Sequence, residues 1–312
     1  LESIGDPTPM MGLAFAAFCT WGDAGEVREV LRCSQAVIDL AGGDPAKGAG
    51  FGIGSPLAAA LAWHGTALWW LGRPGWHQDL HDAAAIARHS NHETHAAVVT
   101  WTYSFAIQCG VVRADDSVVR AIEEALQAAE KSSNAVLGLI KHTLGVALLS
   151  RDAAADHDRG LELTLQARDL YAREHGVFMV PVTELLAGRE RVRRGDRDGA
   201  IAVMRQAADE LRQADRRFWV VWGTGLLVEA LLDHGFEGDV GEAQEAIDRL
   251  ANLPDDGSAM LKITLLRLRA LLAQARGDDV AYRDLVGRYC AMADSLGFEG
   301  HIAWAEALKA IC

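Results

Sequence analysis

The stretch RRGDRDGAIAVMRQA, residues 193–207, carries the pattern on which the fold of this chain depends. A glycine and two aspartates mark a turn, and Ala200, Met204 and Ala207 then follow at intervals of four and three residues. These intervals place the three side chains on one stripe of an α-helix, as expected for a helix buried along one face. The stretch therefore predicts the turn and the second helix of a helical hairpin.

The same turn and stripe recur along the chain, so the sequence is organised as an internal repeat. Regular turns occur in TWGDAGEV at 20–27, WLGRPGW at 70–76, DHGFEGDV at 233–240 and ARGDDVAY at 275–282, with less regular ones near 110–117 and 150–160. The matching stripes are Val27/Leu31/Ser34, Trp76/Leu80/Ala83, Ile122/Leu126/Ala129, Ala243/Ile247/Leu250, Tyr282/Val286/Tyr289 and, less regularly, Leu161/Leu165. Each repeat spans about 42 residues, more than the roughly 34 residues of a tetratricopeptide unit.

Small residues occupy a fixed place in the first helix of each unit. Gly65, Gly145, Gly188 and Ala270 each lie seven residues before the residue that marks the following turn. A small residue at this place allows the two helices of a hairpin to approach closely. The segment LGVAL at 144–148 resembles the tetratricopeptide pattern L-G-x-x-aromatic, with Leu in the aromatic position.

The composition supports an all-α fold. Ala and Leu dominate and only 7 prolines occur, which favours long helices over sheets. We expect a right-handed superhelix of about seven tetratricopeptide-like hairpins. A closing helix is expected near 299–311, and residues 1–312 should form one α-solenoid domain.

Charge, hydropathy and cysteine content limit the partners and the location. The net charge of −13 argues against a nucleic-acid partner for this region, because binding a polyanion requires a concentrated basic surface. The longest apolar stretch, 57–72, is interrupted by His64 and Gly65 and is too short for a membrane span. The 5 cysteines include no CxxC pair, which fits a reducing cytoplasm. Because the chain has no secretory signal and begins at Leu1, we expect a cytoplasmic fragment of a larger protein.

A Gly-rich segment, GGDPAKGAGFGIGSP at 42–56, is inserted between the first and second hairpins. It lacks the order of a phosphate-binding loop, because Lys47 precedes the glycines and Ser55 is followed by Pro56. A flexible connector is the favoured interpretation, and a flap over a ligand is the alternative.

Five histidines lie between residues 71 and 95, and His77 and His81 have the i, i+4 spacing of a metal pair. The buried stripe of Trp76 and Leu80 places them at the flank of their helix, with only two ligands where a structural zinc needs four. His89 is expected near the end of that helix. Ser90 and Glu93 read as a capping box, so His92 and His95 fall in the first turns of the next helix. We therefore expect no metal site.

No catalytic signature is present. The chain has no G-x-S-x-G elbow and no cysteine in a nucleophile signature. The segment HETH at 92–95 is one residue short of H-E-x-x-H. We therefore predict that this chain is not an enzyme, with no catalytic residues and no cofactor.

Tryptophans are abundant, with 9 in the chain. Trp63, Trp69, Trp70, Trp76 and Trp101 fall within two adjacent hairpins. Aromatic residues at helical spacing are usually core, which is the favoured interpretation. The alternative is an aromatic-lined pocket near Trp63–Trp101, which would make the chain a small-molecule receptor.

In a superhelix of this kind the first helices line the concave groove, and their register identifies the residues that face it. The predicted groove residues are Thr66, Trp69, Thr100, Ser104, His142, Arg189, Trp222, Glu229 and Arg267. Aromatic groups and charges of both signs suit a peptide, a partner domain or a polar small molecule. A groove that is only solvated scaffold surface is the alternative.

Three segments together resemble one family: GSPLAAALAWHGTALWWLGRPGWHQDL at 54–80, RRGDRDGAIAVMRQA at 193–207 and LLRLRALLAQARGDDVAYRDLVGRYCAMADSLGFEGHIAWAEAL at 265–308. The family is the C-terminal tetratricopeptide-like region of actinobacterial multidomain regulators. These join a class III adenylate or guanylate cyclase domain to a STAND-type AAA ATPase domain, and related members are LuxR-type ATPase regulators of transcription.

The resemblance implies a non-catalytic regulatory and sensor module for protein interaction and signal transduction. Its partners would be another protein, the ATPase and cyclase domains of its own chain, or a small-molecule effector bound in the groove. The metal-binding aspartates of the cyclase and the phosphate loop of the ATPase are absent from these 312 residues, so no site residue is transferred. In a solenoid each repeat contacts only its neighbours, so small changes in each repeat would add along the axis.

Overall fold

The computed structural model describes residue 6 and residues 8–174, 176–234, 237–254 and 257–310, which form helices and turns and no strand. The helices are α1 (Thr8–Ala24), α2 (Val27–Ala41), α3 (Pro56–Trp70), α4 (Trp76–Ala87), α5 (His92–Val99), η1 (Thr100–Ser104), α6 (Phe105–Gln108), α7 (Asp116–Ala129), α8 (Asn134–Leu149), α9 (Ala154–Arg173), η2 (Val177–Met179), α10 (Val180–Arg193), α11 (Arg197–Gln213), α12 (Arg217–His234), α13 (Glu237–Ala251), α14 (Ala259–Ala275), α15 (Asp279–Leu296) and α16 (Glu299–Lys309).

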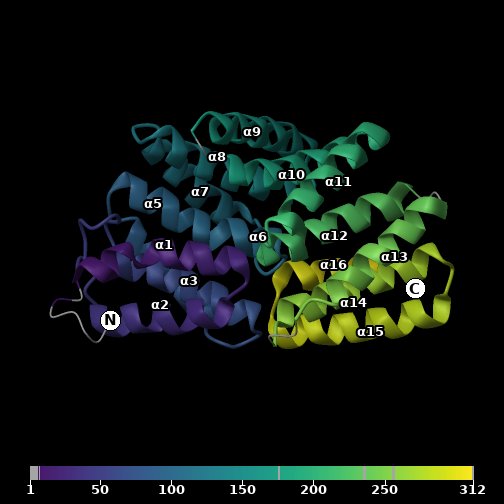
Figure 1. Ribbon diagram of the computed structural model, residues 1–312, viewed down its shortest axis with the longest axis horizontal. Helices are drawn as coiled ribbons and strands as arrows, with labels where there is room; N and C mark the ends of the chain where they lie inside the picture. Colours follow the sequence, from purple (N-terminus) through teal and green to yellow (C-terminus); the bar gives the residue numbers. More distant parts are fainter. Residues whose placement is uncertain (1–5, 7, 175, 235–236, 255–256, 311–312) are drawn as a thin grey trace.

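These helices pack as seven hairpins followed by one closing helix, which confirms the predicted all-α, tetratricopeptide-like superhelix (Figure 1). The hairpins are α1/α2, α3/α4, α5–η1–α6/α7, α8/α9, α10/α11, α12/α13 and α14/α15. The closing helix α16 packs on α15, close to its predicted place.

The predicted stripes form the buried faces of the second helices. Every residue of the six regular stripes is buried except Leu31 and Leu126, which are partly buried. In α9 the predicted pair Leu161/Leu165 is wrong by one position, because Gly160, Thr164 and Ala167 form its buried stripe instead.

Small residues in the first helices do allow close helix pairing, as predicted. A Cβ atom on Gly188 would overlap Cγ of Met204, and one on Gly65 would lie 2.9 Å from Cδ2 of Leu80. The altered stripe of α9 has the same cause, since a Cβ on Gly145 would lie 2.6 Å from the Thr164 hydroxyl oxygen.

The Gly-rich segment packs against α1 and α5. A Cβ atom on Gly12 of α1 would lie 2.5 Å from Cβ of Phe51, and Ile53 is buried. The Gly54 N–H donates a hydrogen bond to the Thr94 hydroxyl at 2.8 Å. Ser55 then caps α3 by accepting from the Ala58 N–H at 3.3 Å. The segment is therefore a connector that is folded onto the first hairpin.

The first three hairpins contact the last part of the chain, which differs from a solenoid whose repeats touch only their neighbours. Helix α1 packs on α12 and α3 packs on α14. The backbone N–H of His301 donates to the Gly110 carbonyl at 2.9 Å, and that of Glu299 donates to the Val111 carbonyl at 2.9 Å. Figure 1 shows α14–α16, in yellow and yellow-green, on the side of the molecule opposite the teal helices α8–α10. The superhelix therefore closes on itself.

A charged contact joins the first hairpin to the sixth at this closure. The Arg216 guanidinium donates to both carboxylate oxygens of Asp23, at 2.7 and 2.8 Å. The Trp219 indole N–H donates to the same carboxylate at 2.5 Å. Arg216 also donates to the Phe178 carbonyl and lies over the Phe178 ring, 5.3 Å from its centroid. We call Asp23–Arg216 the closing ion pair.

The start of α5 differs from the predicted capping box by one residue. Asn91 is the N-cap, and its side chain accepts a hydrogen bond from the Thr94 N–H at 2.8 Å. Ser90 belongs to the preceding turn, where its N–H donates to the Ala87 carbonyl. Among the helices that the structure describes, none is long and apolar enough to cross a membrane.

Candidate functional site

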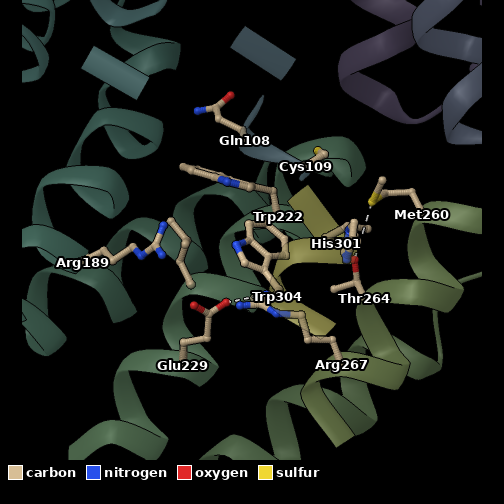
Figure 2. Close-up of a pocket in the computed structure, with 13 residues that line it drawn as sticks. Gln108, Cys109, Arg189, Trp222, Glu229, Met260, Thr264, Arg267, His301 and Trp304 are labelled. Atoms are coloured by element: carbon tan, nitrogen blue, oxygen red, sulfur yellow. Dashed lines mark hydrogen bonds and ion pairs between the residues drawn. The ribbon is translucent and has the colours of Figure 1, made fainter. Parts of the chain in front are cut away.

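A pocket lies where the closed superhelix brings α10, α12, α14, α16 and the end of α6 together (Figure 2). The space between these elements measures about 450 Å³, its open mouth included. Its walls carry the aromatic rings of Trp222 and Trp304, and charged side chains line it from three helices. The elements come from the third hairpin, the last three hairpins and the closing helix, so the pocket depends on the closure.

One ion pair occupies the side of the pocket formed by α12 and α14. The guanidinium of Arg267 lies 2.7 Å from the Glu229 carboxylate, and both side chains are largely buried, at 14% and 18% exposure. Burial alone would raise the pKa of Glu229, but the charges of Arg267 and Arg189 outweigh it and hold that pKa below its usual value. Arg267 also lies over the Trp304 ring, 4.3 Å from the centroid. This cation–π contact fixes the guanidinium in place.

Arg189 is the exposed cation of the pocket. Arg189 follows Gly188 in α10. The close approach of Gly188 to Met204 fixes the rotation of this helix. Figure 2 shows Arg189 extending toward the two tryptophans. Among the described residues it has no hydrogen bond and no ion pair within 4 Å. Its charge acts on Glu229 and on Asp233 from a longer distance.

His301 is a neutral member of the lining. Its Nδ1 forms a hydrogen bond of 2.8 Å with the Tyr289 hydroxyl, and the side chain is buried. Burial, assisted by the charge of Arg267, lowers the pKa of His301 to about 3. The imidazole therefore carries no charge near neutral pH. The charged groups of the lining are the two arginines and Glu229.

Gln108 connects the pocket to a second buried histidine. Its amide lies 3.4 Å from Nε2 of His142 and 3.5 Å from the Ser104 hydroxyl, so both contacts are long and weak. Burial lowers the pKa of His142 to about 4. The amide of Gln108 is thus held loosely at the edge of the pocket.

The structure divides the nine predicted groove residues between two surroundings. Arg189, Trp222, Glu229 and Arg267 line the pocket. The other five are buried in the packing between helices: Thr66, Trp69, Thr100, Ser104 and His142. Thr100, for example, accepts a hydrogen bond of 3.0 Å from the Thr143 hydroxyl of the next hairpin.

Several lining residues were not predicted from the sequence, among them His301 and Trp304 of α16 and Thr264 of α14. The two residues of α16 belong to none of the stripes that define the hairpins. Their position depends on contacts of α16 with residues about 190 positions earlier in the sequence. The segment HIAW at 301–304 puts a histidine and a tryptophan three residues apart on one helical face. That spacing is the one local signal that could have indicated them.

The tryptophan cluster is part of the hydrophobic core, as the favoured interpretation predicted. Trp63 and Trp101 are buried, with ring centroids 6.0 Å apart, and Phe218 stacks on Trp70 at 4.7 Å. A hollow of about 220 Å³ lies beside Trp63 and Trp70, with Thr66 in its wall. The indole N–H groups of both tryptophans lack a hydrogen-bond partner in the described structure.

Within the described ranges, no group of three or more His, Cys, Asp or Glu side chains is arranged to hold a metal ion. His77, His81, His89 and His92 are exposed, and only His95 is buried. The ring of His77 stacks on Trp76, with centroids 3.3 Å apart.

The chemistry available in the pocket suits binding. Burial raises the pKa of the Cys109 thiol far above its usual range, so the reactive thiolate is disfavoured. Glu229 is paired with Arg267 and His301 is neutral, whereas Arg189 is exposed and Trp304 is partly exposed. No family model matches this sequence, and no characterised protein matches it.

Proposed function

We propose that this chain is a non-catalytic sensor and protein-interaction module of a signalling regulator. In this proposal the pocket between α10, α12, α14 and α16 binds a partner or a small effector, and its occupancy modulates attached domains. The observation that carries the proposal is the available cation Arg189 beside the aromatic walls of Trp222 and Trp304. Few but well-placed polar groups within an apolar concave site are typical of ligand recognition.

Helix α12 provides a route from the pocket to the closure. It carries Trp219 near its beginning, which donates to Asp23, and Trp222 one turn later, which lines the pocket. Their rings are in contact, with centroids 5.8 Å apart and planes at 78°. A ligand that moves Trp222 would therefore also act on the contact of Trp219 with Asp23. Such a ligand would be allosteric if it favoured either the closed or the opened arrangement.

The attached domains are proposed from the family resemblance. Segments 54–80, 193–207 and 265–308 resemble the tail of cyclase–STAND ATPase regulators. We propose that the chain acts in the cytoplasm on an ATPase or cyclase domain of this kind. The regulatory role rests on this resemblance, whereas the binding role rests on the pocket.

A thermal-unfolding screen of the full chain against metabolites and short peptides tests the binding role. A ligand at a hundredfold excess over its Kd stabilises the folded state by about 2.7 kcal/mol. We expect at least one ligand that protects the wild type and protects the Trp222→Phe variant less. A screen in which no compound or peptide gives Trp222-dependent protection would contradict the proposal.

A second candidate function is a small-molecule receptor beside Trp63–Trp101. The hollow next to Trp63 and Trp70 favours it because its aromatic walls could pack against an apolar ligand. A ligand bound there would lose affinity in Thr66→Leu, which narrows the hollow, and would keep its affinity in Trp222→Phe. The two variants therefore separate the two candidates.

A further inference from the structure

The charges that line the pocket leave one cation without a close partner. Arg267 pairs with Glu229 and stacks on Trp304, so both members of that pair are engaged. Arg189 has no ion pair within 4 Å among the described residues. With His301 neutral, the two arginines and Glu229 give the lining a net charge of about +1.

The acidic groups that face Arg189 do not neutralise it by direct contact. Glu229 is directed to Arg267, and Asp233, one turn further along α12, is not among the lining residues. Burial and the Glu229 charge raise the pKa of Asp233, and the charges of Arg197 and Arg189 oppose this shift. Arg189 is therefore the group in this pocket that an anionic ligand would reach first.

Two uncharged polar groups of the lining make only weak contacts within the protein. The Thr264 hydroxyl donates only to the Met260 sulfur, at 3.7 Å, and the Gln108 amide has only the two long contacts described above. Sulfur is a weak acceptor, so the hydroxyl can turn toward a ligand oxygen at little cost. Both groups can therefore donate to the oxygen atoms of a ligand.

The shape of the pocket restricts the rest of the ligand. The partly exposed ring of Trp304 and the small exposed part of Trp222 supply apolar surface, and Figure 2 shows Arg189 directed toward them from α10. The space of about 450 Å³ includes the open mouth, so the flat group of a ligand would lie at the mouth while its charged group enters, and a folded domain would not fit.

From these observations we propose that the pocket binds a carboxylate attached to a flat apolar group, with the carboxylate on Arg189 and the flat group against Trp222. A carboxylate matches the planar fork of a guanidinium. A doubly charged phosphate would place a surplus negative charge beside Glu229, which disfavours it. The inference rests on the proposed binding function and specifies its ligand.

A free aromatic acid and the C-terminus of a peptide that ends in an aromatic residue present the same chemistry. The probes for the two sources are 2-naphthoate and the acetylated tripeptide Ala-Ala-Phe with a free carboxylate. Their matched neutral controls are 2-naphthamide and the same tripeptide amide. Titration calorimetry with the full chain measures all four.

We expect at least one of the two acids to bind, and its neutral amide to bind at least about tenfold more weakly, as the loss of a charge-assisted contact requires. Arg189→Gln should weaken the acid by about the same factor and leave the amide unchanged. Arg189 is exposed, so this variant keeps the fold. Arg269→Gln is the matched control, because Arg269 is an exposed arginine of α14 outside the pocket, and it should bind the acid as the wild type does.

Three results would overturn the carboxylate assignment: no binding of either acid at millimolar concentration, equal binding of acid and amide, or unchanged acid binding in Arg189→Gln. If these occur while another compound still protects the chain in a Trp222-dependent way, the proposed binding function stands and only its ligand class is wrong. If no compound protects the chain through Trp222, the proposed function fails as well.

Discussion

Asp23 and Arg216, 193 positions apart in the sequence, form a two-point ion pair with hydrogen bonds of 2.7 and 2.8 Å. The Arg216 side chain is only 9% exposed and would be left without its charge partner if α1 separated from α12. The pair therefore holds the superhelix closed, and the closure creates the pocket. Because the third hairpin and the closing helix line one site, this molecule differs from an open solenoid in which the groove is continuous.

Close helix pairing at Gly188 predicts that Gly188→Ala is destabilising. The added methyl group would overlap Met204, which lies in the buried stripe of α11 and has little room to move. Overpacking of this kind costs about 1–3 kcal/mol. The measurement is the free energy of unfolding in urea.

Gly287→Ala is the matched control for that substitution. Gly287 lies in the interior of α15, and nothing lies within 4 Å of the place its Cβ would take. Without a clash, the higher helix propensity of Ala should stabilise the fold by about 0.5–1 kcal/mol. Effects of the same sign for the two variants would contradict the packing argument.

The buried histidines predict that stability falls on acidification. Burial lowers the pKa of His142 to about 4 and that of His301 to about 3, against 6.5 for a free imidazole. Below pH 6.5 the unfolded chain binds protons that the folded chain does not, so the free energy of unfolding falls as the pH falls. Each histidine contributes a slope of up to about 1.4 kcal/mol per pH unit between its folded pKa and 6.5.

His142→Gln and His301→Gln should each reduce this slope between pH 6 and 5, whatever they do to stability at pH 7. The comparison of slopes is made by urea unfolding at a series of pH values. His92→Gln changes an exposed histidine and should retain the wild-type slope. If the free energy of unfolding of His142→Gln and His301→Gln changes with pH as steeply as that of the wild type, the fold does not hold these imidazoles neutral.

The exposed histidines predict that metal removal has no effect on stability. No set of three ligands converges within the described ranges, and a structural zinc needs four. The unfolding temperature should therefore be the same with and without a chelator such as EDTA. A fall of several degrees in EDTA would reveal a metal that the histidine-rich segment helps to hold.

The hairpins could be predicted because their signal is local. The stripe of Ala200, Met204 and Ala207 needs only the helical period and a turn, and so does the small residue Gly188 that faces it. In α9 the same logic misplaced the stripe by one residue, because Gly160 and Thr164 pack as small residues against Gly145. Leucine is more apolar than either, so hydrophobicity alone favoured Leu161 and Leu165.

The pocket could be predicted only in part, because it depends on contacts that no local pattern encodes. Arg189 and Glu229 were identified from the register of their helices, as were Trp222 and Arg267. Thr100 and Ser104 lie instead in the π-helical turn η1, which interrupts the α-helical period on which the register depends. His301 and Trp304 reach the pocket only because the closing helix returns to the third hairpin.

The most direct test of the closed superhelix is a double-mutant cycle on the closing ion pair. The free energy of unfolding is measured for the wild type, Asp23→Ala, Arg216→Ala and the double variant. If the first and sixth hairpins are in contact, the two substitutions are coupled by about 1–3 kcal/mol, as expected for groups that share hydrogen bonds. If the effects add to within about 0.5 kcal/mol, the two residues do not touch in solution. The closed superhelix and the pocket that depends on it would then be contradicted.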